Sequence, residues 1–177
     1  MVREKYMGKS IEDISNRAFE LAQQYEKRYT GCGQTTIAGT FDALNIDSED
    51  VFKAASGLAD GLGLTGDGSC GSLTGGAMVI GYLFGRQRKD FADMGKPMKS
   101  YILSKKLHDE FVKKYGSCRC YDIQQKLMGR TFNLYDPNEL QQAIEFGMFE
   151  HCSKLVGETA KLTTKIILEE MEKDSQG

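Results

Sequence analysis

The sequence predicts an all-α fold, a single-domain helical bundle of about six to seven helices with one glycine-rich loop. Apolar residues recur at the spacing of amphipathic helices along most of the chain, and no long run of alternating β-branched residues indicates a strand. A chain of 177 residues that is 40% hydrophobic can bury one core without disulfide bonds. We find no internal repeat, linker or second core, so one domain is expected to span residues 1–177, with a flexible polar tail at about 174–177.

Local signals place the ends of the expected helices. Ser10 followed by Asp13 resembles a capping box before an apolar repeat. Pro97 suits the first turn of a long helix that Gly116 ends, and Asp136 provides a cap directly before a proline. The expected helical segments are residues 11–28, a second segment that ends near 45, then 49–58, 72–84, 97–115, 121–128, 137–146 and 148–173.

Glycine is concentrated in one part of the chain. Ten of the 20 glycines lie within residues 57–85, around Cys70. The segment GLGLTGDGSCG, residues 61–71, is expected to be a loop, because glycine permits backbone conformations that interrupt a helix. A G-x-G-x-x-G spacing starts at Gly61, but a helix rather than a strand precedes it, so the context in which this motif binds a dinucleotide is absent.

Charge and cysteine usage exclude some classes of partner. The formal net charge of -2 and the pI of about 5.8 give no basic surplus for nucleic acid or an anionic membrane. The longest apolar run, residues 77–84, is too short to span a bilayer, and no apolar leader segment is found, so we expect a cytoplasmic protein. Because cysteines there are normally reduced, the five cysteines are better explained as ligands, redox thiols or core residues than as disulfides.

Four of the cysteines lie at similar places relative to the expected helices. Cys32, Cys70, Cys120 and Cys152 each lie at or close to an expected loop-to-helix boundary. The N-terminus of a helix presents N–H groups and a positive dipole end, which favour the thiolate that binds metal or performs redox chemistry. Nearby glycines let backbone N–H groups approach a cluster sulfur. Isolated cysteines are also often small core residues, and the chain lacks a C-x-x-C pair, so spacing alone leaves both explanations open.

The segment CGSLTGGAMVIG, taken with the isolated cysteines before and after it, resembles a known family. This is the redox-active protein family named for its pattern of a cysteine, a CGAxxG motif (GCAxxG in the family name) and two further cysteines. The resemblance runs from Thr30 to the last helix and matches Cys32, Cys70, Cys120 and Cys152 to the four family cysteines in order. A related domain of split-Soret cytochromes is associated with an iron–sulfur centre. The resemblance therefore implies a redox role and an iron–sulfur cluster.

Four further residues near Cys70 and Cys120 follow from the same resemblance. Gly71 and Gly75 are the glycines of the CGAxxG motif and are expected to contact the cofactor. Ser72 stands where the motif has alanine, a change that adds a potential hydrogen bond near the sulfur. Cys118 is an extra cysteine two residues before Cys120, so it is an alternative third metal ligand.

Three function hypotheses remain open at this point. The first is an electron-transfer protein in which the four matched cysteines hold one cluster, with [2Fe–2S] as the expected type. The second is a cofactor-free thiol/disulfide oxidoreductase with Cys118 or Cys120 as nucleophile. The third is a helical interaction module stabilised by zinc on the same sulfurs. Whether the chain is an enzyme, and which redox partner protein it serves, are left open.

Other patterns predict packing and charge around the site rather than further ligands or catalytic groups. Gly75, Gly76 and Gly81 form a stripe of small residues, which indicates a closely packed neighbour within the fold or in a homodimer. Arg119 lies between two cysteines and is expected to offset the charge of a cluster or thiolate. A basic stripe on the long helix is expected to be a solvated face. It comprises Lys96, Lys99, Lys105 and Lys106, and His108 in the same helix is expected at or near the surface.

Overall fold

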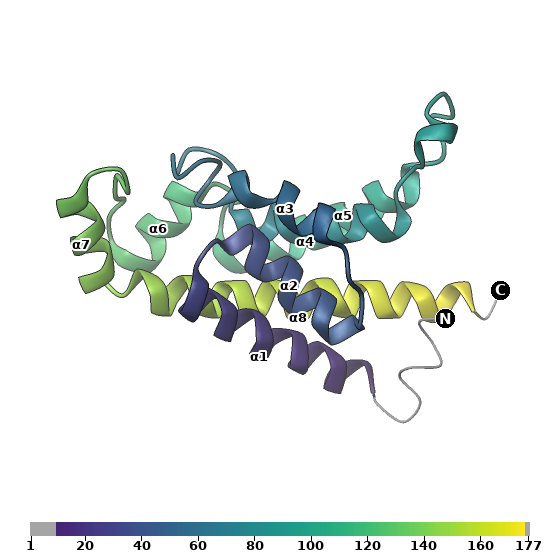
Figure 1. Ribbon diagram of the computed structural model, residues 1–177, viewed down its shortest axis with the longest axis horizontal. Helices are drawn as coiled ribbons and strands as arrows, with labels where there is room; N and C mark the ends of the chain where they lie inside the picture. Colours follow the sequence, from purple (N-terminus) through teal and green to yellow (C-terminus); the bar gives the residue numbers. More distant parts are fainter. Residues whose placement is uncertain (1–9, 176–177) are drawn as a thin grey trace.

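The chain folds into eight α-helices and two short 3₁₀ helices within residues 10–175, the part that the computed structural model describes (Figure 1). This arrangement confirms the predicted all-α class, although the count of α-helices is eight rather than about six to seven. In chain order, the elements are α1 (Ile11–Tyr29), α2 (Cys32–Leu44), α3 (Glu49–Ala54), η2 (Ser56–Leu58), α4 (Gly71–Phe84), η3 (Arg88–Asp90), α5 (Met98–Tyr115), α6 (Cys120–Met128), α7 (Pro137–Glu145) and α8 (Met148–Asp174).

Most helix ends lie where local signals predict them. The capping box of α1 is present, with the N–H of Asp13 bonded to Ser10 Oγ and the N–H of Ser10 bonded to Asp13 Oδ2, both at 3.1 Å. Asp136 caps α7, and α5 ends at Gly116, which has a φ of 88°. The segment expected as one helix over 49–58 is instead α3 followed by η2, because the serine–glycine pair at 56–57, near its end, weakens the α-helix. Of the expected tail, residues 176–177 lie outside the described part.

The main core is built around α8. Figure 1 shows α1 and α8 running antiparallel along the length of the molecule, and α8 also packs against α2, α4 and α5. Small residues make these contacts close. An added Cβ at Gly39 of α2 would lie 2.6 Å from the Cα of Ala22 in α1. The largest fully buried side chains of this core include Ile37, Phe111 and Ile166.

The small-residue stripe of α4 is used for packing within the fold at two of its three positions. A Cβ at Gly75 would lie 2.5 Å from the backbone oxygen of Gly33 in α2. A Cβ at Gly76 would lie 2.5 Å from the hydroxyl of Thr163 in α8, whereas Gly81 faces open space. The expected close neighbours are therefore α2 and α8, and a homodimer contact stays a prediction.

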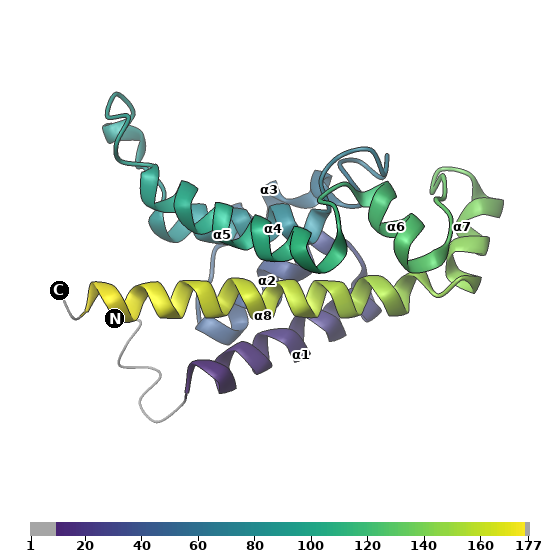
Figure 2. The same cartoon turned by 180° about the vertical axis from the view of Figure 1, so that it is seen from behind.

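The two ends of the molecule differ in character. At one end, α6 and α7 enclose a smaller core of Met128, Phe132, Ala143 and Met148 beside the start of α8 (Figure 2). At the other, residues 85–97 project from the body between α4 and α5. Among residues 10–175, no helix is long and apolar enough to cross a membrane.

The basic stripe of α5 is a solvated face, as expected. Lys105 pairs with Asp109 on the same helix, and Lys106 lies 2.8 Å from Glu169 of α8. Lys99 lies 2.5 Å from Asp174. These side chains are exposed or partly exposed, and they pair with carboxylates at the surface.

Candidate functional site

Four cysteines from four different helices line one cavity of about 390 Å³. Cys32 is the first residue of α2, Cys70 is the N-cap of α4, and Cys120 is the first residue of α6. Cys152 lies in the second turn of α8. All four are free thiols. The fold thus gathers residues up to 120 positions apart in the sequence around a common space.

The glycine-rich loop brings Cys70 and Cys120 to the cavity by pairing with the segment before α6. An isolated antiparallel bridge joins the two segments. The N–H of Cys70 donates to the carbonyl oxygen of Cys118 at 2.8 Å, and the N–H of Cys120 donates to the carbonyl oxygen of Gly68 at 3.0 Å. The pairing fixes both cysteines through backbone contacts, which are independent of side-chain identity.

The loop can approach α6 only because it lacks side chains at the contact. The N–H of Tyr121 donates to the carbonyl oxygen of Gly66 at 2.8 Å, and a Cβ at Gly66 would lie 1.9 Å from an atom of the Tyr121 ring. Gly66 also has a φ of 69°, which favours glycine. The hydroxyl of Thr65 donates to the carbonyl oxygen of Gly61 at 2.8 Å, which folds the loop back on itself.

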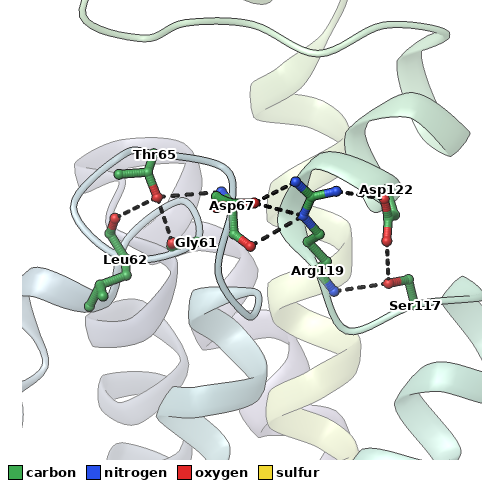
Figure 3. Close-up of polar contacts among 7 residues, drawn as sticks. All are labelled: Gly61, Leu62, Thr65, Asp67, Ser117, Arg119 and Asp122. Atoms are coloured by element: carbon green, nitrogen blue, oxygen red, sulfur yellow. Dashed lines mark hydrogen bonds and ion pairs between the residues drawn. The ribbon is translucent and has the colours of Figure 1, made fainter.

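A polar clasp holds the outside of the same junction (Figure 3). Arg119 Nε donates to the side chain of Asp67 at 3.0 Å and to its backbone oxygen at 3.2 Å, and the guanidinium also lies 3.6 Å from Asp122. Ser117 Oγ donates to Asp122 at 2.7 Å and accepts from the N–H of Arg119 at 3.0 Å. The expectation that Arg119 offsets the charge of the sulfurs is wrong, because its side chain is exposed and committed to these carboxylates.

Cys118 occupies a different environment from the other cysteines. It does not line the cavity, and its partly buried side chain packs against the main core. Its backbone oxygen, rather than its sulfur, contributes to the site through the bond to Cys70. This placement favours Cys120 over Cys118 as the third cavity cysteine.

The motif residues that follow Cys70, Gly71, Ser72 and Gly75, make different contacts. A Cβ at Gly71 would lie 2.5 Å from Cys32 Sγ, so the absence of a side chain there leaves room for that sulfur. A Cβ at Gly75 would instead meet the backbone of Gly33 in α2. Ser72 Oγ lies 3.5 Å from Cys70 Sγ, and the hydrogen bond expected from the serine is therefore present.

A family model described as "Putative redox-active protein (C_GCAxxG_C_C)" matches residues 29–166. The chain belongs to this redox-active protein family. The match covers all four cavity cysteines, and it confirms the resemblance that the sequence indicates. Membership supports a redox role. No curated protein and no solved structure matches the chain.

The four cavity cysteines of this family member are thiols with raised pKa values. Burial is the largest cause at each, and it raises the pKa of Cys32 well above its ordinary value. At Cys70, the backbone N–H groups of Ser72 and Leu73 at the start of α4 lower the pKa, but burial outweighs them. The expectation that helix N-termini favour the thiolate is therefore wrong for these free thiols, because desolvation is the stronger effect.

Two carboxylates and an amide also line the cavity, and the sequence pattern predicts none of the three. Asp60 accepts hydrogen bonds from Cys120 Sγ at 2.9 Å and from Gln124 Nε2 at 2.7 Å. Glu26 is only 6% exposed and accepts from the hydroxyl of Thr35 at 2.5 Å. Burial raises the pKa of both carboxyl groups. Gln124 was detectable, since it lies four residues after Cys120 on the same helix face, but nothing near Glu26 indicates a site.

The arrangement of donors limits which groups fit the cavity. Within residues 10–175, no three cysteine, histidine or acidic side chains converge tightly enough to surround a single metal ion. The donors nevertheless share one cavity, and one oxygen of Asp60, Oδ2, is buried there with no hydrogen-bond partner among the described residues. The four sulfurs thus line a common space, but the described side chains form no compact single-ion site.

Proposed function

We propose that this redox-active family member holds an iron–sulfur cluster on Cys32, Cys70, Cys120 and Cys152 and serves in electron transfer. The observation that carries the proposal is the shared cavity lined by the four cysteines of the family pattern. Four cysteine sulfurs satisfy the ligand count of a [2Fe–2S] cluster, the type we favour. When bound, such a cluster supplies a one-electron redox couple.

The spacing of the donors supports a cluster over zinc. A structural zinc ion requires four ligands that converge tetrahedrally, with sulfur at about 2.3 Å from the metal. Among residues 10–175, no three such ligands converge in this way. The chain also lacks the paired short spacings of structural zinc sites.

The residues around the sulfurs are suited to controlling a reduction potential. Backbone N–H groups of Ser72 and Leu73 face Cys70, and the backbone of Asp60 hydrogen-bonds to Cys32. Hydrogen bonds to ligand sulfurs and exclusion of water are the main protein contributions to cluster potential. Ile123 and Val156 form part of the apolar wall that excludes water from the cavity. The five free thiols fit a reducing compartment such as the cytoplasm, in which a redox partner protein would exchange electrons with the cluster.

Anaerobic reconstitution with iron and sulfide tests the proposal. The wild-type chain should become coloured and contain stoichiometric iron and sulfide, whereas serine substitution of any of the four cavity cysteines should abolish or destabilise the cluster. Cys118→Ser is the matched control, because this residue is also a free cysteine but does not line the cavity. A colourless, iron-free wild-type protein would contradict the proposal.

Other results would support the two remaining hypotheses. Reversible loss of two thiols under mild oxidant, in a chain that takes up no iron, would favour a cofactor-free thiol/disulfide oxidoreductase. Tight binding of zinc with no redox signal would favour a zinc-stabilised interaction module.

A further inference from the structure

Cys118 is the one cysteine of the chain that the proposed cluster does not use. It has no counterpart among the four cysteines of the family pattern, and it does not line the cavity. The pairing between the glycine-rich loop and the segment before α6 nevertheless holds it opposite Cys70, one of the proposed ligands. A thiol outside the ligand set thus adjoins a thiol inside it.

The register of this pairing places Cys70 and Cys118 side by side. The antiparallel bridge joins Ser69 to Arg119, so the residue after Ser69 stands opposite the residue before Arg119. The hydrogen bond from the N–H of Cys70 to the carbonyl oxygen of Cys118, at 2.8 Å, follows the same register. Opposite residues of an antiparallel pair have Cα atoms about 4.5–5.5 Å apart, and disulfides span Cα separations of about 4.4–6.8 Å. The backbone therefore meets the spacing that a disulfide requires.

Both side chains leave the pairing on its inner face. Successive residues of an extended segment point to opposite faces, and Arg119 points outward, where its exposed guanidinium binds Asp67 (Figure 3). Cys118 therefore points inward, and its partly buried side chain packs against the main core, to which Cys70 also belongs. Opposite side chains on one face have Cβ atoms about 4.5–5.5 Å apart, so a shift of about 1 Å brings them to the separation of a disulfide.

The surroundings of the cysteines favour this pair. Cys120, the nearest cysteine to Cys118 in the sequence, stands opposite Gly68 and donates from its sulfur to Asp60 at 2.9 Å. Cys118 is partly exposed, whereas Cys70 is only 5% exposed. Of the two opposed thiols, Cys118 is therefore the one that a small oxidant in solution reaches first.

We propose that Cys118 and Cys70 form a reversible disulfide when the chain meets a peroxide, and that this bond keeps Cys70 from binding the cluster. The thiolate of Cys118 attacks one oxygen of hydrogen peroxide, and the O–O bond breaks to give a sulfenic acid and, with one proton, a water. The thiol of Cys70 then attacks that sulfur, so that an S–S bond forms, the S–O bond breaks and a second water leaves. Two thiols are oxidised and one peroxide is reduced to two waters.

The disulfide has a direct consequence for the cavity. It removes one of the four sulfurs that a [2Fe–2S] cluster requires, so the oxidised chain takes up no cluster until a thiol reductant restores Cys70. This consequence rests on the proposed iron–sulfur function, whereas the disulfide itself rests on the backbone pairing alone.

Peptide mapping of the apo chain tests the pair. The reduced chain is treated with hydrogen peroxide, its remaining thiols are alkylated, and it is digested with trypsin, which cleaves after Arg119 and so separates Cys118 from Cys120. The wild type should lose two thiols and give one species that joins the peptide of Cys70 to the peptide of Cys118. Cys120→Ser is the matched control, because it removes a neighbouring thiol that stands opposite Gly68 and should leave this cross-link intact.

Removal of Cys118 should slow the oxidation. Cys118→Ser should lose thiols roughly fivefold more slowly than wild type, because burial keeps the cavity cysteines protonated. Circular dichroism of the apo chain shows whether the variant folds, and Cys118→Ala provides a second substitution.

Iron uptake tests the consequence. Peroxide-treated wild type should take up less than about a tenth of the iron and sulfide that it takes up after reduction with dithiothreitol, whereas treated Cys118→Ser should keep most of its capacity. A cross-link from Cys70 to Cys32, no cross-link, or equal loss of iron uptake in wild type and Cys118→Ser would overturn this inference and leave the proposed cluster standing. A reduced wild-type chain that takes up no iron and sulfide would overturn the proposed function, and the control of cluster binding with it.

Discussion

The contact between Gly75 of α4 and the backbone of α2 allows a quantitative prediction. A Cβ at position 75 would lie 2.5 Å from the carbonyl oxygen of Gly33, so the two helices would have to separate by about 0.9 Å to reach ordinary contact at 3.4 Å. The obstructing atom belongs to the backbone and cannot rotate away. Gly75→Ala should therefore fall in the upper part of the range for overpacking, about 2–3 kcal/mol.

Helix propensity offsets part of that cost. Replacement of glycine by alanine inside a helix gains about 1 kcal/mol, which leaves Gly75→Ala destabilised by about 1–2 kcal/mol. For a protein of this size, that loss corresponds to a fall in Tm of about 2–8 °C. Gly81→Ala is the control, because the same helix has nothing within 4 Å of a Cβ there. It should gain about 0.5–1 kcal/mol and raise Tm slightly.

Thermal unfolding and denaturant titration of the apo chains measure both variants. Gly75→Ala should also load iron and sulfide less completely, because separation of α4 from α2 moves Cys70 away from Cys32. If Gly75→Ala proved as stable as Gly81→Ala, the close approach of the two helices, and the explanation of the small-residue stripe, would be refuted.

Three further predictions concern the buried groups of the site. Burial raises the pKa of Glu26, so the protonated carboxyl group contributes its full stability below the unfolded pKa, and this stability is lost as pH rises through the folded pKa. Glu26→Gln should therefore be more stable than wild type at pH 7 and equal to it near pH 4 in urea titrations. Ser72→Ala removes the 3.2 Å hydrogen bond to Thr159 and the contact with Cys70, so it should lower the free energy of unfolding by about 1 kcal/mol in denaturant titrations. It should also make the reduction potential of a bound cluster more negative in redox titrations. An unchanged potential would argue against a role for the hydroxyl. Native apo protein should react with a thiol reagent at neutral pH much more slowly than unfolded protein, because burial keeps the cavity cysteines protonated; rapid reaction of all five thiols would contradict the buried cavity.

The features that the sequence predicts best are those fixed by local interactions. The capping box at Ser10 and the end of α5 at Gly116 depend on residues within a few positions of each other, so the pattern alone identifies them. The grouping of Cys32 with Cys152 depends instead on contacts across the whole chain. It was predictable only because the cysteine pattern resembles a family.

The features that the sequence did not predict are tertiary. Asp60 and Cys120 are 60 residues apart, and their contact requires the glycine-rich loop to pair with the segment before α6. The pKa of Cys70 was expected to fall because helix position is a local property. Burial is not local, and it reverses the direction of the shift. Arg119 was expected to offset the charge of the sulfurs because it lies between Cys118 and Cys120 in the sequence. Its side chain instead hydrogen-bonds to Asp67.

The position of α8 has a consequence for how the protein is made. This helix packs against α1, α2, α4 and α5, and it contributes Cys152, but it is the last of the described helices to leave the ribosome. Until it emerges, the face of α1 that packs against α8, including Phe19 beside Gly157, stays uncovered. The growing chain therefore passes through a stage in which apolar helix faces need shielding from aggregation. Neither the core nor the cavity can close before synthesis has passed residue 152, so the proposed cluster would be loaded only after α8 has begun to form.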